Sequence, residues 1–369
     1  MIEHEGRKTE LRPGRALRTL LPAIFFAGAC GCVPSLTYST QTPPLILAPA
    51  QHAGVTDSRG RFREIYCAVY EARGAAAERP CLETLHQLDG EPAPTGRPVQ
   101  LGHSRMKLRI RIVPGIFGEC AEGMATPFLD AVRPLEGQGY DVAAFRVGGR
   151  SSSAHNAEQI RQQIEAMRLQ PNERLVLIGH SKGMSDILEL IGSGNRTAVP
   201  EGSTIISLSG VVSGTPIADR GEAAYRAVSW IPFPGCPVGD QEGVSSLTRR
   251  HRLAYLAEHS LPADLHYYSV AAFTRPQNIS SFLRPTYAAL ARVDARNDGN
   301  VIFHDSIIPG STLLGYLNGD HWAIAMPFHV YAPRRAAIFA SRNRFPRVVL
   351  MEAIARTVEE RYLEEEGAR

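Results

Sequence analysis

Hydrophobic positions follow two alternating patterns along the middle of the chain. Short continuous apolar runs predict buried strands, and residues repeating every three or four positions predict helices between them. The predicted strands are Lys107–Val113, Tyr140–Val147, Leu175–Ile178, Ser203–Leu208, Leu265–Phe273 and one within Ile307–Leu317. The predicted helices cover residues 125–135, 157–167, 184–191, 286–293 and 348–363. This order predicts an α/β fold with a mainly parallel central sheet and helices on both faces.

Residues 211–264 interrupt this alternation. Their stretch Trp230–Gly235 is too rich in proline for regular structure, and a helix is expected at about 246–259. We interpret the whole insertion as a cap or lid.

The segment before the first strand differs in composition. Residues 33–105 are rich in Pro, Gly and Ala, and contain one helical stripe from Phe62 to Tyr70 and a second short helical pattern at Leu82, Leu85 and Leu88. We interpret them as a linker with a small helical decoration, preceding a main domain over residues 106–369.

The N-terminus has the pattern of a secretory signal. Five basic residues between Arg7 and Arg18 precede an apolar run, Leu20–Ala29, which is too short to span a bilayer. The sequence Ala27-Gly28-Ala29-Cys30 resembles a bacterial lipobox, so Cys30, or alternatively Cys32, is a candidate for lipidation. A plain signal peptide or short anchor is the other interpretation. Either way residues 1–32 are set apart from the fold, and we expect an exported cell-envelope protein, anchored to a membrane by lipid.

Export changes the interpretation of four further cysteines. Cys67, Cys81, Cys120 and Cys236 form an even set without metal-binding spacing, which is typical of disulfides in an oxidising compartment. A bridge between the first two would staple the N-terminal hairpin, and the other two would tie the first core loop to the insertion. Other pairings remain open. The net charge is only +3 over 369 residues, which argues against a nucleic-acid partner.

A Gly-x-Ser-x-Gly motif follows the strand at 175–178. Strand, motif and helix together predict a nucleophile elbow, in which Ser181 occupies a strained turn at the carboxyl edge of the sheet. Gly179 and Gly183 are expected because side chains there would collide with backbone. A serine nucleophile needs a base, and the base needs an acid that orients it. Asp298 and His321 follow Ser181 in the required order, Asp298 within Asn-Asp-Gly-Asn and His321 within Gly-Asp-His-Trp.

Each of these residues has alternatives. Asp298 could be only a turn residue, with Asp294 and Asp320 as its rivals. His304 follows Asp298 too closely to be the base, and His329 lacks the matching sequence context.

The three motifs together resemble the active-site blocks of bacterial lipases and esterases of the α/β-hydrolase fold, over residues 107–330. This resemblance implies Ser181 as nucleophile, Asp298 as orienting acid and His321 as general base. It also implies oxyanion donors at the backbone amides of Ile116, less firmly Phe117, and Lys182. Two positions depart from the family: Pro114 replaces a histidine, and Lys182 replaces a glutamine or methionine. The Lys182 side chain is expected to contact an acidic group or the substrate.

The predicted function is hydrolysis of carboxylic esters, with an acyl or lipid ester as substrate partner and no cofactor or metal. Trp230, Phe233 and Trp322 are candidates for an acyl pocket or for ordinary packing, and Ser151–Ser153 for substrate contact or a helix N-cap. An acyltransferase with the same triad, and a non-catalytic envelope lipoprotein on a hydrolase scaffold, are the alternative functions.

Overall fold

The computed structural model describes residues 54–74, 80–121, 126–192, 194–232, 235–341 and 343–367. The predicted signal segment with Cys30 and Cys32, and also Phe233, lie outside these residues. Within the described ranges, none of the helices has the length and apolar character needed to cross a membrane.

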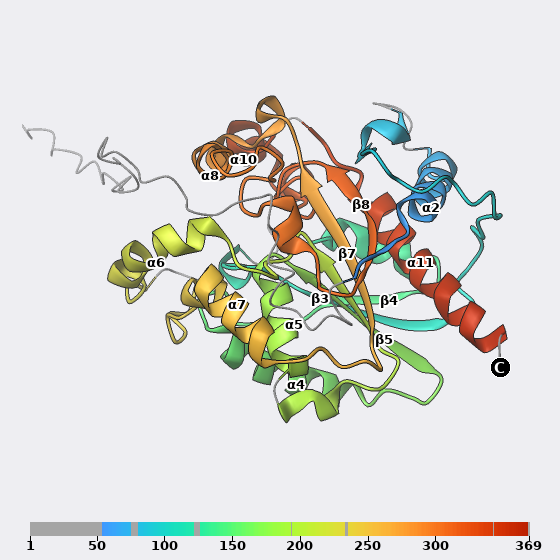
Figure 1. Ribbon diagram of the computed structural model, residues 1–369, viewed down its shortest axis with the longest axis horizontal. Helices are drawn as coiled ribbons and strands as arrows, with labels where there is room; N and C mark the ends of the chain where they lie inside the picture. Colours follow the sequence, from blue (N-terminus) through green and yellow to red (C-terminus); the bar gives the residue numbers. More distant parts are fainter. Residues whose placement is uncertain are drawn as a thin grey trace, which may run out of the picture. The chain divides into compact units, whose positions relative to one another are not determined.

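An eight-stranded sheet forms the centre of the fold (Figure 1). Its strands are β1 (Thr56–Asp57), β2 (Leu85–His86), β3 (Lys107–Val113), β4 (Asp141–Ala144), β5 (Glu173–His180), β6 (Thr204–Leu208), β7 (His266–Phe273) and β8 (Thr312–Asn318). The strand order is β1-β8-β7-β6-β5-β3-β4, all parallel, and β2 pairs antiparallel with β8. Carboxyl ends of the parallel strands therefore share one edge, where ligands bind in such sheets.

Helices and short 3₁₀ turns connect these strands. The helices are α2 (Arg59–Ala72), α3 (Val132–Glu136), α4 (Ser153–Met167), α5 (Lys182–Gly192), α6 (Pro216–Val228), α7 (Arg249–Glu258), α8 (Arg284–Leu290), α9 (Phe328–Tyr331), α10 (Pro333–Phe339) and α11 (Arg347–Gly367). The 3₁₀ turns are η3 (Cys81–Glu83), η4 (Glu119–Ala121), η5 (Leu129–Ala131), η6 (Gly194–Ala198), η7 (Ser245–Leu247), η8 (Pro276–Asn278), η9 (Ser281–Leu283) and η10 (Phe303–Ser306).

Two apolar cores lie on opposite faces of the sheet. Side chains alternate along each strand, so that Val176 and Ile178 of β5 face one core while Leu175 and Leu177 face the other. Helices α2, α3 and α11 pack on the first face, and α4, α5 and α7 on the second, as Figure 1 shows. The predicted α/β fold, with a mainly parallel sheet covered by helices on both faces, is confirmed.

Three local predictions differ from the structure. The helix expected at 125–135 is only the turn η5 followed by α3. The second N-terminal helix is wrong: Leu82 is exposed in η3, and Leu85 is buried in β2, where strand pairing overrides the helical spacing. The insertion contains a helix that we did not predict, α6, which is capped by the Thr215 side chain and has Pro216 in its first turn.

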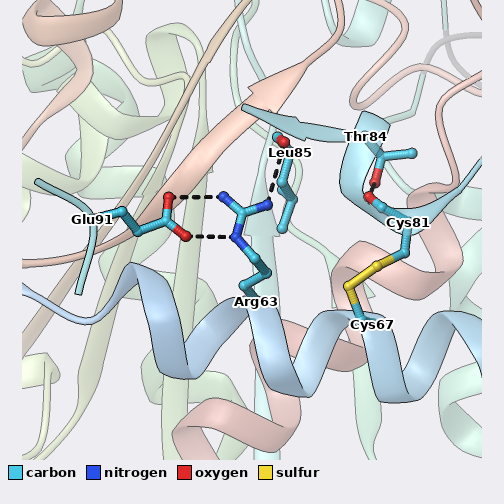
Figure 2. The surroundings of a disulfide bond; sticks show 6 residues. All are labelled: Arg63, Cys67, Cys81, Thr84, Leu85 and Glu91. Carbon is cyan, nitrogen blue, oxygen red and sulfur yellow. Dashed lines mark hydrogen bonds and ion pairs between the residues drawn. A yellow bond between two sulfur atoms is a disulfide. The ribbon is translucent and has the colours of Figure 1, made fainter. Parts of the chain in front are cut away.

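The N-terminal segment is part of the central sheet and its core, rather than a decoration on the surface. β1 and β2 both pair with β8, and the α2 stripe, which includes Phe62 and Tyr66, is buried in the core shared with α11. Arg63 of α2 binds the segment that follows this helix, as Figure 2 shows. Its guanidinium donates to the Glu91 carboxylate at 2.5 Å and to the Leu85 carbonyl at 3.3 Å.

Both predicted disulfides are present. Cys67 of α2 is bonded to Cys81 of η3, as Figure 2 shows. Cys120, in the loop after β3, is bonded to Cys236 of the insertion. The second bond joins segments 116 residues apart and holds the insertion to the first loop of the core.

Candidate active site

Ser181 lies in the sharp turn between β5 and α5. Its φ is +56°, a left-handed conformation that is costly for a residue with a side chain. Added Cβ atoms would lie 2.5 Å from Met184 Cα at Gly179, and 2.1 Å from the Val113 carbonyl oxygen at Gly183. Both glycines are therefore required by backbone contacts, as the motif predicts.

The loop after β3 approaches the serine directly. A Cβ on Gly115 would lie 2.7 Å from Ser181 Cβ and 3.1 Å from its Oγ. No larger residue fits there without moving the hydroxyl. This contact places the predicted oxyanion loop beside the predicted nucleophile.

Asp298 and His321 meet in a buried pair. His321 Nδ1 donates to Asp298 Oδ2 at 2.6 Å, and the His321 amide donates to the Asp298 carbonyl at 2.9 Å. The other carboxylate oxygen, Oδ1, accepts from the amides of Asn300 and Val301 at 2.9 and 2.8 Å. The turn that the Asn-Asp-Gly-Asn sequence predicts thus fixes the carboxylate, and the carboxylate fixes the imidazole. Asp298 is thus both the residue that stabilises this turn and the hydrogen-bond acceptor of the His321 ring.

His321 Nε2 is free for chemistry. This buried nitrogen has no hydrogen-bond partner among the described residues. With Nδ1–H donated to Asp298, Nε2 carries the imidazole lone pair, which is the property that a general base requires. A hydrogen bond from the Ser181 hydroxyl to this nitrogen is not formed in the part of the chain described; such bonds often tighten only when substrate is bound.

His180 connects the nucleophile turn to the His321 loop. Its Nε2 lies 3.2 Å from the His321 carbonyl oxygen, and the two rings lie 4.6 Å apart. Burial, together with the nearby His321, lowers the pKa of His180 well below its usual value. A neutral His180 donates to the carbonyl and so holds the backbone that carries His321. Sequence analysis did not identify this contact.

The rival carboxylates have other structural roles. Asp320 accepts from the amides of Ser280, Trp322 and Ala323, at 2.6, 3.1 and 2.7 Å, which anchors the turn around His321. Burial raises the pKa of Asp320. Asp294 forms an ion pair with Arg296 at 2.7 Å. Neither is bonded to the His321 ring.

The rival histidines also make other contacts. His329 Nε2 lies 2.9 Å from the Ser341 carbonyl oxygen. Burial lowers the pKa of His304 to about 4, and its ring packs against Phe303.

The predicted oxyanion donors are not equivalent. The Phe117 amide donates to the Gly149 carbonyl at 3.0 Å, so it is already engaged. Gly149 is needed there because a Cβ would lie 2.8 Å from the Phe117 nitrogen. The Ile116 amide remains the candidate from this loop. Lys182 begins α5, where first-turn amides lack intrahelical partners.

The Lys182 side chain is buried and paired. It donates to Asp186 Oδ1 at 2.5 Å, while Asn156 donates to Oδ2 at 2.8 Å and to the Gly148 carbonyl at 3.0 Å. Burial raises the pKa of Asp186, although Lys182 opposes that shift. Of the two contacts expected for the Lys182 side chain, an acidic group or the substrate, the structure shows the first, with Asp186. Asp186 follows Lys182 by four residues, a helical pairing distance that could have identified it from sequence.

The remaining candidates have different environments. Ser152 caps α4 by accepting from the His155 amide at 3.2 Å, and its hydroxyl donates to Asp240 of the insertion at 2.5 Å. Trp230 is exposed, whereas Trp322 lies in an aromatic cluster.

Comparisons with known proteins agree with this architecture. No family model matches the chain, and no curated protein matches it. A solved structure, the metagenomic carboxyl esterase MGS0156, is 42% identical to this chain, with a TM-score of 0.78. The match covers 85% of this chain and 95% of the esterase. The chain belongs to the carboxyl esterase family of α/β-hydrolases.

Two lipase structures are more distant from this esterase-family chain. The mature lipase BlEst2 of Bacillus licheniformis is 18% identical, covering 66% of this chain and 96% of its own length with a TM-score of 0.48. Lipase 1 of Pelosinus fermentans is 13% identical, covering 69% and 99% with a TM-score of 0.46. The family assignment rests on the first structure alone.

Proposed function

We propose that this protein hydrolyses carboxylic esters through Ser181, His321 and Asp298. The observation that carries the proposal is the buried His321–Asp298 pair, whose second imidazole nitrogen has no partner among the described residues. This pair contacts His180, the residue directly before a serine held in a strained elbow. No cofactor is required by this chemistry.

The reaction follows from these positions. His321 Nε2 accepts the Ser181 proton as Oγ attacks the ester carbonyl, and Asp298 stabilises the imidazolium that forms. The amides of Ile116 and Lys182 donate to the developing oxyanion. His321 then returns the proton to the departing alcohol, leaving an acyl-enzyme. Water, activated by the same imidazole, attacks the acyl-enzyme and releases the acid.

The surroundings of the serine support an acyl substrate. The Val211 amide donates to the Ser181 carbonyl at 2.9 Å, so this residue lies beside the nucleophile. Val211 belongs to an apolar cluster with Leu247 and Val301, against which Ile116 packs. An apolar cluster that begins at a residue bonded to the Ser181 backbone favours an acyl or lipid ester over a charged substrate.

Ester hydrolysis is tested with p-nitrophenyl esters of increasing chain length. Ser181→Ala is expected to lower kcat by at least about 10³-fold and abolish labelling by a fluorophosphonate, since the nucleophile is gone. Asp298→Asn is expected to lower kcat by about 10²–10⁴-fold, because His321 loses its orienting acceptor. The control, Ser203→Ala, changes a buried serine that precedes β6 and donates to the Pro200 carbonyl. Full activity of Ser181→Ala would refute the proposal.

The same assay separates the alternative functions. An acyltransferase would form a new ester when an alcohol is added, at the expense of free acid. A scaffold without catalytic function would not be labelled by the fluorophosphonate at all.

We also propose that the protein is exported and anchored to the cell envelope through Cys30, or alternatively Cys32. The disulfides Cys67–Cys81 and Cys120–Cys236 support an oxidising compartment. Incorporation of labelled palmitate should be lost in Cys30→Ser and kept in Cys32→Ser. The reverse pattern would assign the second cysteine, and incorporation unaffected in both variants would refute the anchor.

A further inference from the structure

Four large apolar side chains are exposed on neighbouring elements after β7. Phe282 of η9 is 71% exposed, Val330 and Tyr331 of α9 are 56% and 45% exposed, and Ile338 of α10 is 81% exposed. Single exposed apolar residues are ordinary, but a group of them on adjoining elements marks an interaction site.

Direct contacts join these elements into one surface. The Ser281 hydroxyl, in η9, donates to the carbonyls of Ile338 and Phe339 at 3.3 and 3.0 Å. The Phe282 ring stacks on Trp322 at 5.3 Å, and Trp322 in turn contacts Phe339 at 5.7 Å. η9 therefore contacts α10 and continues directly into α8, which begins at Arg284. Because Trp322 follows His321 in the chain, the surface adjoins the candidate active site.

Within residues 275–351, the stretch that supplies this surface, the exposed charges have one sign. From His321 to Met351 the sequence has no acidic residue. Between residues 275 and 320 the acidic residues are four aspartates, and all are buried: Asp294, Asp298, Asp305 and Asp320. Arg284, at the start of α8, and Arg334, on α10, are exposed. On α10, Arg334 and Ile338 are four residues apart and therefore lie on the same side of the helix.

We infer that this arginine–aromatic surface (Phe282, Arg284, Val330, Tyr331, Arg334 and Ile338) docks on an anionic lipid surface. The apolar side chains would enter the boundary between headgroups and acyl chains, while the guanidinium groups bind lipid phosphates. This partner matches both properties of the surface, its apolar exposure and its uniform positive charge. Docking would bring the loop that carries His321 close to the lipid. The catalytic importance of this position rests on the proposed function.

The binding test uses the full chain and vesicles of two compositions, phosphatidylcholine alone and phosphatidylcholine with phosphatidylglycerol. Arg284→Gln/Arg334→Gln should weaken partitioning to anionic vesicles by about 30-fold, and barely change it on neutral ones. Phe282→Ser/Ile338→Ser should weaken partitioning to both vesicles, by at least about tenfold. The matched control is Arg168→Gln/Leu82→Ser, which changes an exposed arginine after α4 and an exposed leucine on η3, on elements that contribute nothing to this surface.

A local readout excludes a contribution from other segments. The chain has two tryptophans, so Trp230→Phe leaves Trp322 beneath the surface as the single tryptophan. Brominated anionic lipid should quench its emission, and the double arginine substitution should remove most of that quenching.

The outcomes are distinct from those of the proposed function. Activity on a short soluble ester should be unchanged in the arginine variant, which also verifies its folding. Equal vesicle binding by the arginine variant and the parent, or no quenching of Trp322, would overturn the inference and leave ester hydrolysis standing. Self-association that Ile338→Ser abolishes, without lipid binding, would assign the surface to a second copy of the chain instead.

Discussion

Gly115 offers the sharpest test of the active-site geometry. An added methyl would lie 2.7 Å from Ser181 Cβ and 3.1 Å from Oγ. Non-bonded carbons prefer separations of about 3.5–4.0 Å, so the loop or the serine must shift by about 1 Å. Displacement of a reacting group by about 1 Å can lower the rate by about 10²-fold. We therefore expect Gly115→Ala to lower kcat/KM for a soluble p-nitrophenyl ester by about 10²-fold, and to slow fluorophosphonate labelling in parallel.

The control is Gly102→Ala, since an added Cβ at Gly102 would meet nothing within 4 Å. Thermal unfolding followed by circular dichroism separates a local displacement from unfolding, because overpacking costs about 1–3 kcal/mol. If Gly115→Ala kept its activity within about threefold of the parent, a difference below about 1 kcal/mol, the close approach of the loop to the nucleophile would have no catalytic importance.

Three further substitutions test the framework of the fold. Cys120→Ser/Cys236→Ser should lower the free energy of unfolding by about 4–5 kcal/mol in urea, since this bond closes a loop of 116 residues; an unchanged urea midpoint would contradict this. Lys182→Met should cost about 3–5 kcal/mol by leaving Asp186 buried without its cation, and a further Asp186→Leu change should recover part of that loss. Recovery would be absent if the pair were not coupled. Burial lowers the pKa of His304 to about 4 in the folded chain. Below about pH 6.5 the unfolded chain therefore takes up a proton that the folded chain does not, and the free energy of unfolding decreases as the pH decreases. His304→Gln should therefore lose about 2 kcal/mol less than the parent between about pH 7 and pH 5 in urea unfolding, and parallel losses would refute this.

The elements near the serine could be predicted because their signals are local. A buried strand, a Gly-x-Ser-x-Gly motif and a helix are contiguous, and each constrains the next. The pairing of Asp298 with His321 is consistent with chain order and motif context, although the distance between them appears only once β8 is in place.

Predictions failed where contacts between distant segments decide the structure. Leu85 has helical spacing from its neighbours, yet it pairs with Leu317 of β8, and no local pattern reveals that partner. β1 has only two residues, too few for any periodicity. The engagement of the Phe117 amide by Gly149 likewise depends on two loops that meet only in the folded chain.

The position of β8 has a consequence for biosynthesis. It pairs with β1 and β2 from the start of the described chain, and the Asn318 amide at its end donates to the Thr84 carbonyl at 2.8 Å, three residues before His321. The imidazole thus follows a strand that is synthesised late and is seated between the early β1 and β2 on one side and β7 on the other. A nascent or partly translocated chain that already contains Ser181 would still lack its base, so ester hydrolysis would begin only after the last strand is seated.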